Sequence, residues 1–172
     1  MIPKENNYAY IDGANLHKGI KSLGWNMDYA RLRIWLSEKY AVKRAYLFIG
    51  MVPKFNDLYK FLQEVGYTLV FKETVRDSVG NIKGNCDADL VLQAARDYYE
   101  HHFDRAVLVS SDGDYACLVK FFHEKDKMRV VLSPGNRCSI LIKRTNVPIV
   151  YLDNKYHLLA KNKKAPNTDG TA

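Results

Sequence analysis

The chain has 172 residues, which is enough for one α/β domain with a hydrophobic core, and its 47% apolar and 12% aromatic content excludes a disordered protein. No apolar run approaches the roughly 18 residues that cross a bilayer, and a strand is predicted too near the N-terminus to leave room for a signal peptide, so we expect a cytoplasmic protein with no membrane partner. A formal net charge of +7 favours polyanionic partners, and three widely spaced cysteines indicate neither a disulfide framework nor a structural zinc site.

Taken in order, the first part of the chain alternates short apolar runs with amphipathic segments. These patterns predict a strand at residues 8–12, a helix at 28–40, a strand at 43–49, a helix at 54–65 and a strand at 67–71. The polar segment 73–85 follows and contains two glycines, which predicts a long loop or a short hairpin.

The second part continues the alternation, with a helix at residues 86–101, a strand at 106–110, a helix at 112–124, a strand at 129–132, a short helix at 137–144 and a strand at 147–152. The last strand is expected at a sheet edge, because Pro148 cannot donate to a ladder. Strands alternating with helices predict a mainly parallel sheet of five to six strands with helices on both faces, in a single three-layer α/β/α domain over residues 1–160. The small, polar residues 161–172 predict a disordered tail.

Acidic side chains follow two of the predicted strands. Asp12 ends the first strand, and Asp112 and Asp114 follow the strand at 106–110. If these strands are neighbours, as in doubly wound sheets, their carboxyl ends place the acids together at the edge where such sheets bind ligands. A purely structural interpretation also fits, with Ser111 as the N-cap of a capping box closed by Asp114 and with Asp12 in an ordinary turn.

A third acid is directed toward the same region by the helix predicted from residue 86. At about 100° per residue, Asp87 lies on the centre line of the apolar stripe that faces the sheet, whereas Asp89 points about 170° away from it. Burying a carboxylate costs several kcal/mol unless a partner compensates it, so Asp87 requires a cation.

Such a cluster of carboxylates favours a divalent metal, because the acids repel one another without compensating charge. Oxygen ligands suit Mg²⁺ or Mn²⁺ rather than zinc, and the five histidines form no ligand pair. Magnesium held by few carboxylates keeps water in its remaining positions, as phosphodiester hydrolysis requires.

Three segments carrying these acids resemble motifs of the NYN domains in the PIN-like nuclease superfamily, in the LabA-like branch. The resemblance spans roughly residues 8–152, and the segments are Ile11-Asp-Gly-Ala-Asn-Leu16, Lys83-Gly-Asn-Cys-Asp-Ala-Asp-Leu90 and Val109-Ser-Ser-Asp-Gly-Asp-Tyr115. The resemblance implies a Rossmann-like PIN fold, an acidic metal pocket and endoribonuclease activity.

Matched residue by residue, the resemblance implies catalytic and metal-binding roles for Asp12, Asp87, Asp112 and Asp114, with Asn15 orienting water or phosphate. Many relatives have another acid where this chain has Gln93. The helical periodicity places Gln93 about 130° from the side that faces the sheet, so this departure has little bearing on the chemistry.

Substrate contacts are expected around these acids. Arg76 and Lys83 in the polar segment and Ser111 beside the acids are candidates for binding a phosphate backbone, together with Asn15. Trp25, near the first motif, is the aromatic residue best placed to stack on an unpaired base. The predicted partner is therefore single-stranded RNA, and a homodimer stays open as an alternative to a monomer.

Two other functions use the same residues. A non-catalytic RNA- or protein-binding module would retain the acids as structural caps. A phosphohydrolase acting on small phosphate esters ranks below both, because the first strand is followed by no Asp-x-Asp nucleophile motif and the chain has no phosphate-binding glycine loop. We therefore predict a Mg²⁺- or Mn²⁺-dependent endoribonuclease.

Overall fold

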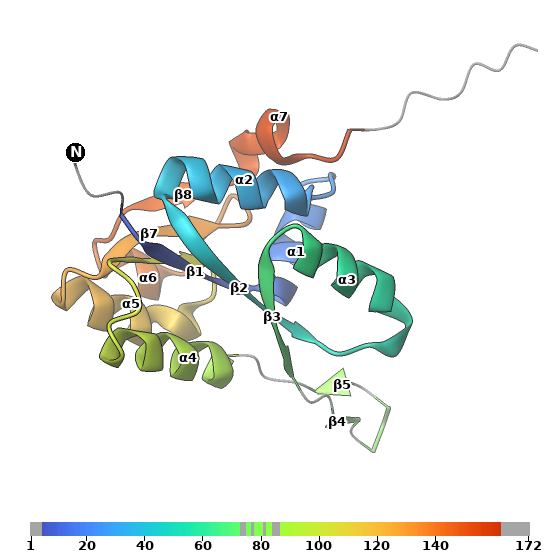
Figure 1. Cartoon of the computed structure of the whole chain (residues 1–172), viewed down its shortest axis with the longest axis horizontal. Helices are drawn as coiled ribbons and strands as arrows, with labels where there is room; N and C mark the ends of the chain where they lie inside the picture. The colour runs from blue at the N-terminus through green and yellow to red at the C-terminus, as the bar shows by residue number, and fades with distance from the viewer. Residues whose placement is uncertain (1–4, 73–74, 77, 81, 84–86, 163–172) are drawn as a thin grey trace, which may run out of the picture.

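The computed structural model describes residues 5–72, 75–76, 78–80, 82–83 and 87–162, and its centre is a six-stranded parallel sheet (Figure 1). The strand order is β3-β2-β1-β6-β7-β8. The strands are β1 (Asn7–Asp12), β2 (Val42–Gly50), β3 (Tyr67–Lys72), β6 (Ala106–Val109), β7 (Met128–Ser133) and β8 (Ile149–Tyr151). All six predicted strands are therefore present, and the predicted parallel sheet is confirmed.

The inner strands are buried on both faces, as expected for a parallel sheet covered by crossover helices. All four residues of β6 are buried, as are five of the six residues of β1. The outermost strand on one side is β8, as predicted from Pro148, which contributes only its carbonyl oxygen by accepting a hydrogen bond from the Val131 N–H at 2.9 Å.

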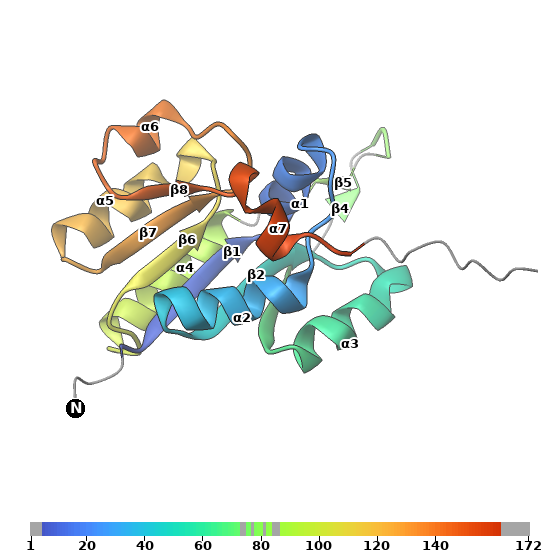
Figure 2. The same cartoon turned by 90° about the horizontal axis from the view of Figure 1, so that it is seen from above.

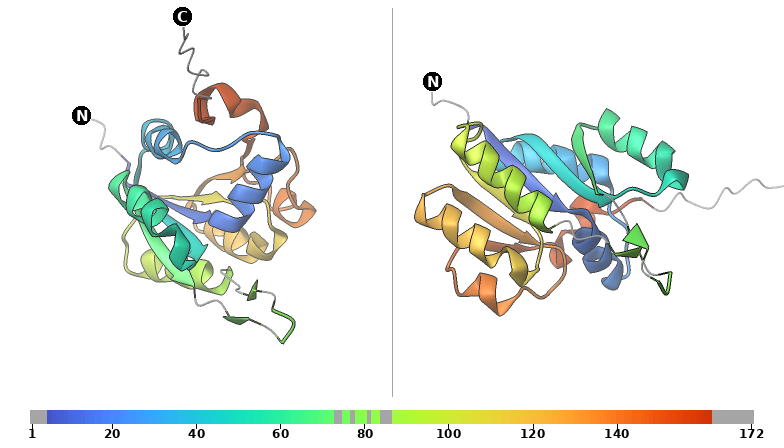
Figure 3. Two further views of the ribbon diagram at one scale, coloured as in Figure 1. Left: turned by 90° about the vertical axis from the view of Figure 1, so that its right-hand side faces the viewer. Right: turned by 90° about the horizontal axis from the view of Figure 1, so that it is seen from below.

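The helices form a layer on each face of the sheet (Figures 2 and 3). One hydrophobic core joins the sheet to α1 (Gly13–Ser22), α2 (Tyr29–Tyr40), α3 (Asn56–Glu64) and α7 (Tyr156–Leu159). The other joins it to α4 (Asp87–Tyr99), α5 (Ala116–Glu124) and α6 (Ile140–Lys143). The three-layer α/β/α architecture is confirmed, and no described helix is long and apolar enough to cross a membrane.

The polar segment after β3 contains a short antiparallel hairpin, β4 (Val75–Arg76) paired with β5 (Ile82–Lys83). The hairpin lies near the carboxyl end of β3 (Figure 3). Residues 73–74, 77, 81 and 84–86 lie outside the described part of the chain, as do residues 163–172 of the predicted tail. The first tail residue, Lys161, is described, and its N–H donates to the Asn26 carbonyl at 3.0 Å.

Two helices were not predicted from the sequence. The helix α1 was missed because Leu16 and Ile20 are its only buried apolar side chains and Gly13 suggested a turn. The helix α7 has four residues, too few for a periodic pattern, and follows the 3₁₀ turn η3 (Asp153–Lys155). A similar 3₁₀ turn, η1 (Pro53–Phe55), precedes α3.

The helix predicted at 112–124 is divided into a 3₁₀ turn, η2 (Gly113–Tyr115), and α5. The prediction of a helix at 137–144 is wrong for the first three residues. The helix begins only at Ile140 because the preceding Ser139 is its N-cap, with the Ser139 hydroxyl accepting from the Leu141 N–H at 3.2 Å.

Gly13 allows α1 to start against the end of β2. A Cβ at this position would lie 2.5 Å from Ile49 Cγ2 and 2.8 Å from the Phe48 carbonyl oxygen, and the latter cannot rotate away. We expect Gly13→Ala to lower the free energy of unfolding by about 1–3 kcal/mol through overpacking. Urea denaturation measures this loss. Gly135→Ala is the control, because the nearest atom to its added Cβ lies 3.9 Å away; an equal loss there would contradict the explanation.

Candidate functional site

The candidate site lies at the carboxyl ends of β1 and β6, where the order of the strands reverses. These strands pair in parallel, and the last paired residues are Ile11 and Val109. From β1 the chain continues to β2 and β3 on one side, whereas β6 leads to β7 and β8 on the other. The predicted neighbourhood of the two acid-bearing strands is therefore confirmed, at the point where open α/β sheets bind ligands.

Asp12 ends β1 and is the N-cap of α1. Its Oδ1 accepts a hydrogen bond from the Asn15 N–H at 3.0 Å, and the side chain is buried, with 6% of the residue exposed. Burial raises the pKa of Asp12, the nearby charges of Asp87 and Asp112 raise it further, and the donors from Asn15 and Tyr115 partly oppose this shift. The ionised form of the Asp12 carboxyl group is therefore unfavourable unless a cation compensates its charge.

Asp112 and Asp114 lie in the turn that follows β6. Asp112 is half-buried and caps η2, its Oδ1 accepting from the Asp114 N–H at 3.0 Å, whereas Asp114 is exposed. A Cβ on the glycine between them, Gly113, would overlap the Ser139 hydroxyl, so that side chain would have to shift. The capping box suggested as a structural alternative is wrong, because Asp112 rather than Ser111 is the cap.

Asp87 is the first residue of α4, and its carboxylate lies beside those of Asp112 and Asp114. One carboxylate oxygen from each of Asp87, Asp112 and Asp114 lies within 4.8 Å of the other two. Asp12 lies outside this close group, although its carboxylate interacts electrostatically with those of Asp87 and Asp112. Three carboxylates at this spacing, one of them exposed to solvent, fit a hard divalent cation that keeps some of its water.

The Tyr115 hydroxyl contacts two of the acids, a role that was not predicted from the sequence. It donates to Asp87 Oδ1 at 2.7 Å and lies 3.3 Å from Asp12 Oδ2. Burial and these two carboxylates raise the pKa of Tyr115, so the hydroxyl keeps its proton and remains a donor. A tyrosine three residues after Asp112, on the side of the turn that faces the core, was the signal available in the sequence.

Asn15 and Ser111 connect the two acid-bearing loops. Asn15 Oδ1 accepts hydrogen bonds from the Ser111 N–H at 3.0 Å and from the Ser111 hydroxyl at 3.1 Å. The structure therefore brings these two residues to the acids and to each other, and their predicted contact with substrate stays a prediction. The observed contact ties the first turn of α1 to the loop after β6.

The helical periodicity of α4 predicted that Asp89 and Gln93 point away from the acidic cluster. Asp89 is exposed, as predicted. Gln93 is half-buried and does not reach the acidic cluster, because its Nε2 donates to Asp97 Oδ1 at 3.0 Å. Asp97 itself is 1% exposed, and its position seven residues after Leu90, almost two full turns, could have identified it as a buried acid.

Asp97 belongs to a second acidic group with Glu100 and His102. Its carboxylate is already satisfied by protein donors, since the Tyr10 hydroxyl lies 2.8 Å from Oδ2 and His102 Nδ1 lies 3.2 Å from Oδ1. The group also lies at the far end of α4 from Asp87. We interpret it as a structural network that anchors α4 to β1.

Arg76 and Lys83, predicted to bind phosphate, lie on the two strands of the hairpin. The pairing sets Arg76 opposite Ile82 and Lys83 opposite Val75. Their side chains lie outside the described part of the structure, so their contacts with substrate stay predictions.

Comparison with known proteins identifies the family and the fold. The NYN domain model matches residues 8–152. A protein of unknown function from Vibrio parahaemolyticus RIMD 2210633 is 22% identical over 92% of this chain and 98% of its own, with a TM-score of 0.76, and therefore shares the fold. Comparison with curated proteins gives no significant match.

Two further solved structures are more distant. A mutant of the T5 5′-exonuclease is 16% identical over 74% of this chain and 50% of its own, with a TM-score of 0.41. The T5 D15 protein co-crystallised with metal ions is 15% identical over 74% and 54%, with a TM-score of 0.39. The chain spans about half the length of both T5 proteins.

The parallel α/β sheet and the acidic cluster at its carboxyl edge fit a domain of the PIN-like nuclease superfamily, and the family match places the chain in that superfamily. Within it, the chain belongs to the NYN domain family, as the match over residues 8–152 shows.

The role of the Tyr115 hydroxyl can be tested by Tyr115→Phe in metal-free buffer. The variant removes the hydroxyl that donates to Asp87 Oδ1, so we expect the free energy of unfolding to fall by about 1–3 kcal/mol. Urea denaturation in chelator measures the change. Tyr98→Phe is the matched control, because Tyr98 is half-buried and makes ring contacts with Phe121 and Phe122; a similar loss in both variants would mean that the hydroxyl does not stabilise the cluster.

The raised pKa of Asp12 predicts how stability depends on pH. The folded protein binds this proton more tightly than the unfolded chain does, so ionised Asp12 destabilises the metal-free fold; the effect is absent below the ordinary pKa of 3.8 and complete above the folded-state pKa. Asp12→Asn keeps the cap acceptor and removes the charge. In chelator, we expect the variant to have the higher Tm at neutral pH and the difference to shrink in acid. A difference that does not change with pH would contradict this origin.

Proposed function

We propose that this NYN domain is a metal-dependent endoribonuclease that hydrolyses phosphodiester bonds of single-stranded RNA. The observation that supports it is the convergence of Asp87, Asp112 and Asp114 within 4.8 Å, beside the buried Asp12, at the switch point of the sheet. The three sequence motifs that carry these acids support placing the chain in the LabA-like branch.

Each acid has a role in this proposal. Asp87, Asp112 and Asp114 hold Mg²⁺ or Mn²⁺, and Asp12 adds negative charge from the buried side of the cluster. When bound, the cation would lower the pKa of a water molecule and neutralise charge that develops on the phosphate. Tyr115 keeps Asp87 in place by donating to it, and the Asn15–Ser111 contact keeps the two loops in register.

RNA as the substrate rests on charge and on the residues around the site. The net charge of +7 favours a polyanion, and Arg76 and Lys83 are proposed to contact its phosphates from the hairpin. Phosphoryl transfer depends on positioning and charge stabilisation more than on a protein nucleophile, which fits a site built from carboxylates.

One observation favours a different function. Asp12 and Asp112 each cap a helix or turn, so both acids have a structural use that needs no metal. A non-catalytic RNA-binding module could keep them for this reason alone. Such a module would bind RNA equally well in chelator and would cleave none of it.

Cleavage of labelled single-stranded RNA by wild type and Asp112→Asn tests the proposal. Asparagine keeps the size and the cap acceptor but removes one charge, so the variant should fold and bind RNA. We expect its cleavage rate in Mg²⁺ or Mn²⁺ to fall about a thousandfold, or about 4 kcal/mol of transition-state stabilisation.

Asp89→Asn is the matched control, since it makes the same substitution on an exposed acid in the first turn of α4. It should cleave at the wild-type rate. Equal cleavage by wild type and Asp112→Asn would overturn the assignment of the site. Binding without cleavage by the wild type in either metal would favour the binding module, and faster cleavage of a matched single-stranded DNA would overturn the choice of RNA.

A further inference from the structure

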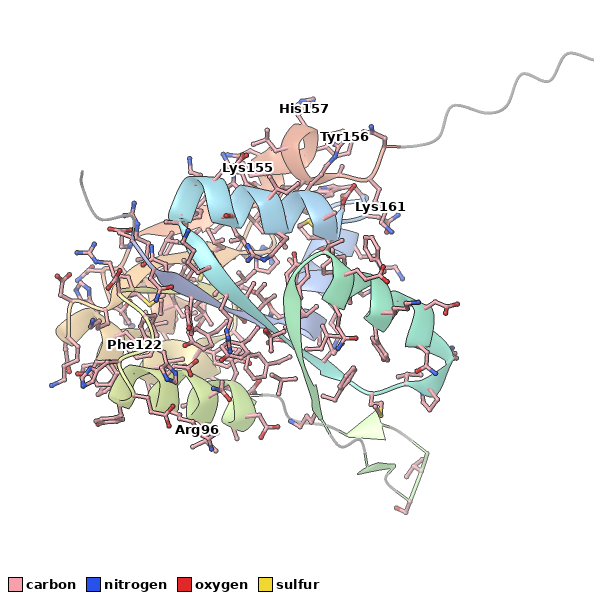
Figure 4. The ribbon with its side chains drawn as sticks, viewed as in Figure 1. Arg96, Phe122, Lys155, Tyr156, His157 and Lys161 are labelled. Atoms are coloured by element: carbon pink, nitrogen blue, oxygen red, sulfur yellow. The ribbon has the colours of Figure 1, made fainter. Side chains whose placement is uncertain are left out.

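A second feature of the carboxyl edge is an open pocket of about 590 Å³ on the other side of α1 from the acids. Its walls come from α1, from the end of β2, from α3 and from the loop before α2. The labelled Tyr156 and Lys161 mark this side of the sheet, whereas the labelled Arg96 lies on the α4 side (Figure 4). Pockets of roughly 300–1,000 Å³ are the usual size for small ligands.

The first turn of α1 separates this pocket from the acidic cluster. Asp12 caps the helix on the side of the acids, and Asn15 contacts Ser111 there. The neighbouring residues Gly13 and Ala14 line the pocket. A polymer bound at the acids therefore needs only to pass over one helical turn to enter the pocket.

The pocket is apolar inside and has exposed aromatic side chains at its opening. Leu47 and Leu62 are buried and form part of its floor, whereas Phe55 is 42% exposed and Phe61 is 39% exposed. Trp25 also lines it and packs in a T-shaped arrangement against Tyr156, with the ring centroids 5.8 Å apart. Flat aromatic surfaces beside an apolar floor are suited to stacking on a nucleic acid base.

The charges at the pocket are positive. Lys21 and Lys161 line it together with His17, and within the described part of the chain its wall contains no carboxylate. The ammonium group of Lys54 lies 5.0 Å from the centre of the Phe55 ring, which places a cation next to an exposed stacking surface. An apolar interior with a basic rim matches a base that carries a phosphate.

We propose that this pocket binds an unpaired base of the RNA strand, next to the phosphate held at the acids, with the adjoining phosphate on the basic rim. The inference rests on the proposed function and gives it a specificity element, since a strand must offer an unpaired base to enter the pocket. An uncharged apolar ligand would leave the cations of the rim without partners.

Fluorescence of Trp25 tests this directly. The chain has two tryptophans, so Trp35→Phe leaves Trp25 as the only reporter, and adding Asp112→Asn suppresses cleavage while Mg²⁺ is present. The probe is a single-stranded RNA hexamer of adenosine, whose binding is followed separately by anisotropy of an end label. We expect Trp25 emission to change with the same midpoint as the anisotropy. Binding with no change in Trp25 emission would overturn the pocket while leaving the proposed nuclease function untouched.

A variant and a modified probe locate the base. Phe55→Ala should weaken binding about tenfold through lost stacking, whereas Tyr99→Ala, which removes a 69% exposed ring from α4, should change it less than about twofold. Abasic substitution at one position of the hexamer should weaken binding to the wild type about tenfold and to Phe55→Ala much less. Equal weakening at every position, or no effect of Phe55→Ala, would overturn the proposal.

The remaining outcomes separate the two hypotheses. Pocket binding with no cleavage by the wild type in Mg²⁺ or Mn²⁺ would support the pocket and overturn the proposed nuclease. Trp25 emission that depends on protein concentration without RNA, together with a dimer in sedimentation, would identify the pocket as a contact between two copies and overturn base binding.

Discussion

The structure of the site is governed by the electrostatic repulsion among four neighbouring carboxylates at the end of a buried sheet. Asp12 shows this effect most clearly, because burial and its acidic neighbours all raise its pKa. The fold compensates with donors that carry no formal charge: the Asn15 N–H on Asp12, the Asp114 N–H on Asp112 and the Tyr115 hydroxyl on Asp87. Neutral donors reduce the repulsion without removing it, so the cluster keeps its affinity for a cation.

The helices contribute to the same balance. The acids Asp12, Asp112 and Asp87 each lie at the start of a helix or 3₁₀ turn, where the unpaired N–H groups of the first turn stabilise negative charge. The switch point explains why this is possible, because chains leaving neighbouring strands in opposite directions bring two helix starts together. In the proposed nuclease, the same helix starts would also stabilise a phosphate of the substrate.

Much of this could be predicted from the sequence, because the decisive signals are local. Apolar runs bounded by turn residues identified the six strands, and helical periodicity identified the inward direction of Asp87. The contacts that complete the site are not local. Tyr115 meets Asp12 across 103 residues, and Asn15 meets Ser111 across 96, so no periodic pattern reveals either. The capping role of Ser111 was predicted wrongly for the same reason, since its long-range bond to Asn15 replaced a local one.

The bond between Asn15 and Ser111 also has a consequence for the biosynthesis of the protein. It joins the first helix to a loop made 96 residues later, which contains Asp112 and Asp114 of the acidic cluster. A nascent chain that ends before residue 115 has no metal site, whatever secondary structure its first strands have reached. If the domain is a nuclease, it is therefore inert while its first half emerges from the ribosome, when RNA is closest to it. In that case the order of the chain delays RNA hydrolysis until most of the sheet has been synthesised.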